Sequence, residues 1–169
     1  MLRDGRRLRI RAIDRSDAAA LVEMGRRSTP EDLRLRFFGM VRPEPGPLAS
    51  LLSDFDHDRQ IAVAAYDPNS AGAEDEFLGV VRLICAPDNR QGEFSIMVRS
   101  DLKGQGLGAG LMREMLDWAS KCGLARVEGR ILAENKTMLQ LARKCGAVIE
   151  PSDDDFLTVR VAFSLATGA

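Results

Sequence analysis

The sequence predicts one domain, spanning 1–169, of the α/β (α+β) class, in which helices flank a mixed central β-sheet. A single domain usually has roughly 100–200 residues, and this chain has 169. Two strands joined by a tight turn are expected near its middle, at 77–86 and 93–99, and a strand, helix, strand crossover is expected after them. An antiparallel pair followed by a crossover forms a mixed sheet, which excludes a simple sandwich and a doubly wound sheet.

The first half of the chain is expected to begin with a strand and two helices. Apolar and basic residues alternate over 8–12, which predicts the strand, and Asp14 is a typical cap for a helix over 15–24. Pro30 stands at the first position of the second helix, which is expected to end at Gly39. The remaining elements expected in this half are a short helix, a strand and a loop, at 48–52, 60–66 and 67–76.

The second half contains the two middle strands and then alternates between helix and strand. A helix is expected over 106–121, a strand over 126–132 and a helix over 135–145 that is closed by Gly146. A last strand is expected over 156–165. The predicted order is therefore β-α-α-β-β-β-α-β-α-β.

Composition and charge narrow the class of partner. The formal net charge of −1 and the isoelectric point near 5.9 provide no overall attraction to nucleic acid or to an anionic membrane, and no apolar run is long enough to span a bilayer. Cys85, Cys122 and Cys145 are widely spaced in apolar segments, which predicts reduced core thiols and a cytoplasmic protein. The single histidine, His57, stands among aspartates that are typical of a solvated turn, so no metal site is predicted.

The most informative stretch is the glycine-rich turn between the strand at 93–99 and the following helix. Gly104, Gly106 and Gly108 have no Cβ, so backbone N–H groups can approach a phosphate closely, and the helix start adds further N–H groups. A dinucleotide fingerprint through Ala109 is the weaker interpretation, because several residues separate the strand from the first glycine and too little chain remains for that fold. A Walker loop would need Gly-Lys-Ser/Thr, which is missing.

The segment from Lys103 to Gly108 resembles the acyl-CoA loop, Q/R-x-x-G-x-G/A, of the GNAT N-acetyltransferases, with lysine at its first position. The segment from Asn135 to Gly146 resembles the family pattern N-x-x-A-x-x-L-Y-x-K-x-G-F. The resemblance extends from about Leu8 to Leu165. It implies the GNAT fold, a mixed central sheet of about six to seven strands flanked by about four helices.

The resemblance also implies acetyl-CoA as the cosubstrate. In the family the pyrophosphate lies on the glycine-rich turn, the pantetheine arm pairs with the preceding strand, and the asparagine lies near the cofactor. The cofactor-binding residues expected from this resemblance are Met97, Val98, Arg99, Lys103, Gly104, Gln105, Gly106, Leu107, Gly108, Ala109 and Asn135.

One branch of the family is most similar. The segments RSTPEDLRLRFFG at 27–39 and DFDHDRQIAVAAYD at 54–67 resemble the acetyltransferase domain of bacterial protein lysine acetyltransferases of the Pat type. This resemblance implies a protein substrate with an acceptor lysine, an acyl-CoA synthetase being one candidate. In that branch the domain is often joined to a larger module, so the chain is expected to be a standalone member or an excised domain.

Glu93 is the expected general base. A lysine amine is protonated at neutral pH, so its attack on a thioester requires a base. The Pat-type resemblance assigns that role to the glutamate at this strand position, and burial would raise the pKa of such a carboxyl. The alternative interpretation is a structural carboxylate paired with Arg82 or Arg99.

Two other functions remain open from the sequence. One is N-acetylation of a small amine such as a polyamine or an amino sugar, and the other is a catalytically silent acyl-CoA sensor.

The expected reaction is direct attack of the amine on the thioester, with a strand N–H near Met97 or Val98 holding the oxyanion. Ala142 occupies the position where many relatives have a tyrosine that protonates the leaving thiolate, so no general acid is assigned.

Overall fold

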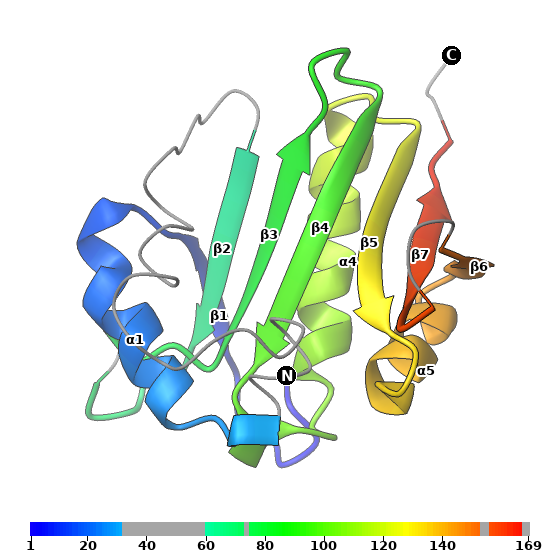
Figure 1. Ribbon diagram of the computed structural model, residues 1–169. Coiled ribbons are helices and arrows are strands. Elements are labelled where there is room, and N and C mark those ends of the chain that lie inside the picture. The colour runs from blue at the N-terminus through cyan, green and yellow to red at the C-terminus, as the bar shows by residue number, and fades with distance from the viewer. Residues whose placement is uncertain (32–59, 73–74, 153–155, 167–169) are drawn as a thin grey trace.

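The computed structural model describes residues 1–31, 60–72, 75–152 and 156–166. They form one seven-stranded sheet in the order β1-β2-β3-β4-β5-β7-β6 (Figure 1). Neighbouring strands are antiparallel except β4 and β5, which are parallel, so the predicted mixed sheet is confirmed. The strands are β1 (Arg9–Ala12), β2 (Gln60–Tyr66), β3 (Gly79–Cys85), β4 (Gln91–Val98), β5 (Arg126–Leu132), β6 (Val148–Pro151) and β7 (Thr158–Ser164).

Three α-helices lie wholly within the described residues: α1 (Ala18–Arg26), α4 (Leu107–Lys121) and α5 (Lys136–Lys144). Short 3-10 turns at Arg15–Asp17 and Ser100–Leu102 precede α1 and the glycine-rich turn. All but the first residues of the helix expected after Pro30, and the whole helix expected over 48–52, lie outside the described part of the chain.

Strand β6 corrects the predicted order, which had no element between the helix at 135–145 and the last strand. Its four residues pair antiparallel with β7, and its side chains are half-buried or exposed. A segment this short that ends in proline and buries little apolar surface carries almost no alternation to recognise. The last strand also begins later than expected, because Phe156 and Leu157 precede β7 and are exposed.

Helices cover both faces of the sheet. Alternation along the strands turns Phe94 and Ile96 toward α4 and α5 on one face, and Met97 toward α1 on the other. The larger core on the first face includes Leu111, Met112 and their neighbours from β2, β3 and β5. Strand β4 therefore contributes side chains to both cores and lies near the middle of the sheet (Figure 1).

Two expectations about composition can be compared with the structure. Within the described ranges, no helix is both long enough and apolar enough to cross a membrane. All three cysteines are free, but only Cys85 is buried, and Cys145 is half-buried. The prediction of three core thiols is wrong for Cys122, which is exposed where α4 ends.

Candidate active site

Strands β4 and β5 run side by side for only part of their length. Their pairing covers Gln91–Glu93 of β4 and ends at the pair of Glu93 with Glu128. Strand β4 continues to Val98 and stays paired with β3 on its other side, while β5 turns away from it (Figure 1). Over 94–98, β4 therefore offers, within the described residues, an edge of backbone N–H and C=O groups that a ligand with amide groups can pair with.

A cavity of about 620 Å³ occupies this opening, and its walls come from β4, β5, α4 and α5. That volume lies in the range of roughly 300–1,000 Å³ typical of small-molecule sites. The cavity extends from Glu93 along β4 to the glycine-rich turn and the seam between α4 and α5. The strand edge, the turn and the helix start thus line the same cavity. The sequence predicted them as parts of one site.

The glycine-rich turn has a backbone conformation that suits anion binding. Gly104 and Gly106 have φ values of +79° and +91°, in the left-handed region that other L-residues avoid. Gly106 is also the N-cap of α4, and it has no side chain to accept a hydrogen bond from the first-turn N–H groups. These N–H groups and the helix dipole therefore remain available to a phosphate at the cavity wall.

Packing around the turn holds it against its neighbours. A Cβ on Gly108 would lie 2.8 Å from Leu141 Cδ2, so the start of α4 packs directly on α5. The backbone N–H of Arg3 donates to the Gln105 carbonyl at 3.0 Å, which joins the N-terminal residues to the turn. Asn135 caps α5 by accepting from the Met138 N–H at 3.3 Å, and it lies on the cavity wall.

Glu93 is exposed and lines the cavity, at the point where β4 and β5 separate. The described residues therefore do not bury this carboxylate, contrary to the expectation from the sequence. The ion pairs considered from sequence are absent as well: Arg82 donates to Gln60, and Arg99 donates to Asp101 and Glu76. Among the described residues Glu93 has no hydrogen bond or ion pair, which leaves its carboxylate open to a substrate.

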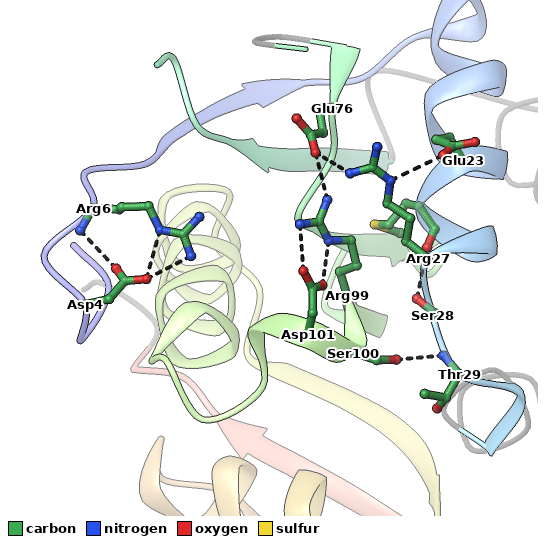
Figure 2. Close-up of polar contacts among 11 residues, drawn as sticks. Asp4, Arg6, Glu23, Arg27, Ser28, Thr29, Glu76, Arg99, Ser100 and Asp101 are labelled. Carbon is green, nitrogen blue, oxygen red and sulfur yellow. Dashed lines mark hydrogen bonds and ion pairs between the residues drawn. The ribbon is translucent and has the colours of Figure 1, made fainter. Parts of the chain in front are cut away.

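A cluster of four charged residues, the Arg99 cluster, lies beside the turn and consists of Arg27, Glu76, Arg99 and Asp101 (Figure 2). Arg99 is only 7% exposed. Its Nε and Nη2 donate to the two Asp101 oxygens at 2.7 and 2.9 Å, and its Nη1 donates to Glu76 at 3.0 Å. Arg27 at the end of α1 donates to the same Glu76 oxygen, so the cluster connects α1 with the turn at Ser100–Leu102.

Hydrogen bonding from these arginines lowers the pKa of both carboxylates in the cluster. For Asp101 the main cause is the hydrogen bonds from Arg99. For Glu76 it is again the bond from Arg99, and the charge of Arg27 adds to it. Both carboxylates therefore stay ionised at neutral pH, and the cluster is a set of paired charges.

The cavity wall contains most of the residues predicted to bind the cofactor. These are Met97, Val98, Lys103, Gly104, Gly106, Leu107, Gly108, Ala109 and Asn135. Arg99 and Gln105 are not among the residues of the wall. The Arg99 side chain belongs instead to the cluster just described. Whether each of these residues binds a cofactor stays a prediction.

Most of the basic residues of the wall were not predicted from the sequence. Five of the described residues that line the cavity are basic and one is acidic; the basic ones are Arg3, Lys103, Arg113, Arg130 and Lys144, and the acidic one is Glu93. Of the five, only Lys103 was predicted. The others come from the N-terminal segment, the second turn of α4, β5 and the end of α5, and no local motif relates these positions.

An open strand edge, a turn with unsatisfied N–H groups and a basic cavity are the features of a class of protein that binds a ligand carrying both amide groups and phosphates. Comparison with known proteins agrees with that class. Residues 7–148 match the family model of the acetyltransferase (GNAT) domain. The chain belongs to the GNAT acetyltransferases and is an enzyme of that family, whose cosubstrate is acetyl-CoA.

Individual relatives agree with this assignment. The chain is 27% identical to the acetyltransferase PA5475 of Pseudomonas aeruginosa, over 91% of this chain and 82% of the relative. The GNAT domain of PAT from S. lividans has a TM-score of 0.81 with 24% identity, over 97% of this chain and 94% of the other. The spermidine N-acetyltransferase of Vibrio cholerae, solved with CoA and spermine, has a TM-score of 0.72 with 21% identity, over 95% and 96%. The predicted GNAT fold is confirmed.

Proposed function

We propose that this acetyltransferase modifies the side-chain amine of a lysine on another protein, with Glu93 as the general base. The observation that carries the base assignment is the position of Glu93: it is the only carboxylate among the described residues of the cavity wall, and it has no partner there. The likeness to the GNAT domain of PAT and the Pat-type motifs support a protein acceptor. An acyl-CoA synthetase is the first acceptor to test.

The proposed role of Glu93 is to remove the proton from the lysine ammonium group before the amine attacks. A lysine of pKa about 10.4 is disfavoured in its neutral form at pH 7 by about 3.4 units, or about 4.6 kcal/mol at 1.36 kcal/mol per unit. Glu93 stands at the fork of β4 and β5, where the wall opens to solvent, so an amine can enter beside it. A base in this position accepts the proton directly or through one water molecule.

The remaining chemistry is assigned to the strand and to the cosubstrate. Acetyl-CoA supplies a thioester carbonyl that an amine can attack. The open edge of β4 around Met97 and Val98 provides backbone N–H groups that can hold the developing oxyanion. Burial raises the pKa of the Cys85 and Cys145 thiols, so both stay protonated at neutral pH, which supports direct transfer without a cysteine intermediate.

Intact-mass measurement tests the acceptor. The enzyme is incubated with acetyl-CoA and, in parallel, with an acyl-CoA synthetase, with spermidine or with an amino sugar. The expected result is addition of one acetyl group to the protein, and its loss when the modified lysine is replaced by arginine. Acetylation of the small amines alone would contradict a protein acceptor and leave the family assignment intact.

We also expect a cytoplasmic enzyme, because its three cysteines are free.

A further inference from the structure

The single carboxylate among the described residues of the cavity wall and two of its five cations come from different elements. Glu93 lies at one end, where β4 and β5 divide. The seam between α4 and α5 contributes two cations to the wall, Arg113 and Lys144, and no carboxylate among the described residues. An acceptor amine and an anionic donor are therefore each expected at a different end.

Arg113 and Lys144 lie on the same wall. The start of α4 packs on α5 through the contact of Gly108 with Leu141. Arg113 on the second turn of α4 lines the same cavity as Lys144 and Cys145 at the end of α5. The two basic side chains consequently border the cavity from adjacent helices.

Neither of these two cations has a counterion within the part of the chain that the structure describes. Both side chains are exposed, and neither makes a hydrogen bond or an ion pair among the described residues. Two nearby cations are paired by contrast: Lys121 of α4 with Asp117, and Arg126 of β5 with Glu128 and Glu150. Two unpaired cations on one wall repel each other, and an anion bound between them would relieve that repulsion.

The phosphates of coenzyme A differ in what can bind them. The glycine-rich turn supplies neutral N–H groups at the start of α4, which suit the bridging pyrophosphate. The third phosphate is a monoester on the ribose, and such a group carries about −1.5 to −2 charges at pH 7. Arg113 lies six residues after Leu107, about 9 Å along the helix axis, so it is beyond the turn and within reach of the nucleoside.

We propose that Arg113 and Lys144 bind the 3′-phosphate of coenzyme A and thereby select this coenzyme over its 3′-dephospho form. The proposal rests on acetyl-CoA being the donor and is independent of the acceptor. Charge-assisted contacts from two helices hold the nucleotide end, while β4 receives the thioester end near Glu93.

Calorimetry with coenzyme A and with 3′-dephospho-coenzyme A tests the proposal. The wild type is expected to bind the former at least about tenfold more tightly, and Arg113→Gln or Lys144→Gln to reduce that preference about three- to tenfold. The double variant is expected to bind both nucleotides equally. Arg143→Gln is the matched control, because Arg143 is the neighbouring exposed cation of α5 and lies outside the cavity wall. It should keep the wild-type preference.

Three outcomes would overturn the proposal. Equal binding of both nucleotides by the wild type would show that the 3′-phosphate is not recognised. An equal loss in Arg143→Gln and Lys144→Gln would indicate a general effect of charge at the helix end. Absence of binding by either nucleotide would remove the donor as well, whereas tight coenzyme A binding without acetylation of any protein would remove only the lysine acceptor.

Discussion

One group of charged residues lies beside the glycine-rich turn and another lines the cavity, and the two groups differ in whether their charges are paired. In the Arg99 cluster each arginine donates to a carboxylate, and Arg99 itself is buried. In the cavity, Arg113, Lys144 and Glu93 are exposed and have no such partner among the described residues. Paired charges fix backbone positions, whereas unpaired charges on a cavity wall gain their partner from a ligand. The partners of an arginine, rather than its distance from the turn, therefore indicate its role.

The largest expected effect is a loss of turnover on substitution of Glu93, and it should not occur on substitution of the neighbouring Glu128. Glu93→Gln should lower turnover by roughly a hundredfold or more, the usual scale for a general base, with coenzyme A affinity and unfolding free energy unchanged. Glu128→Gln is the control, because Glu128 lies opposite Glu93 in the pairing of β4 with β5. It lies outside the cavity wall and is paired with Arg126. Steady-state kinetics with the identified acceptor gives the comparison. Equal turnover in wild type and Glu93→Gln would remove Glu93 from the mechanism.

The next largest expected effect is on stability, and it concerns the paired Arg99. Arg99→Gln removes the donors to Asp101 and Glu76, which should lower the free energy of unfolding by about 2 kcal/mol. The exposed Arg113, changed to Gln, should alter it by less than about 0.5 kcal/mol. Urea unfolding measures both. If Arg113→Gln proved the more destabilising of the two, the distinction between paired and unpaired arginines would fail.

Much of the fold was readable from local patterns, because β2 and β3 are nearly continuous apolar runs, β4 and β5 alternate, and α4 has helical periodicity. The backbone of the glycine-rich turn was equally clear, since Gly104 and Gly106 adopt the left-handed conformations that make glycine necessary, while phosphate binding there stays a prediction. The pairing of Arg99 with Glu76 could not be predicted, because Glu76 lies 23 residues earlier on another loop. The role of Lys144 depends on the packing of α5 against α4, which leaves no local signal in the sequence.

A change that leaves every charge in place tests the backbone of the turn. Gly106→Ala places a Cβ at φ +91°, which should cost about 1–2 kcal/mol in the free energy of unfolding or shift the turn. Gly110→Ala is the matched control within the same helix: a Cβ there meets nothing within 4 Å, and alanine should stabilise the helix by about 0.5–1 kcal/mol. Urea unfolding and coenzyme A calorimetry check both variants. Equal effects of the two substitutions would contradict the assigned conformation.

The smallest expected effect is the pH dependence of the Arg99 cluster. Arg99 lowers the pKa of Asp101 and Glu76 in the folded state, so the unfolded chain takes up protons first as the pH falls. The stability contributed by these pairs is therefore complete above the ordinary carboxyl pKa values and is lost as the pH falls from about 5 toward 3. Arg99→Gln should show a shallower loss over this window, so its unfolding free energy should approach that of the wild type at the acid end. Some slope should remain, because Arg11 still lowers the pKa of Asp17 through its hydrogen bonds. Parallel curves for the two proteins would show that the cluster contributes no stability through ionised carboxylates.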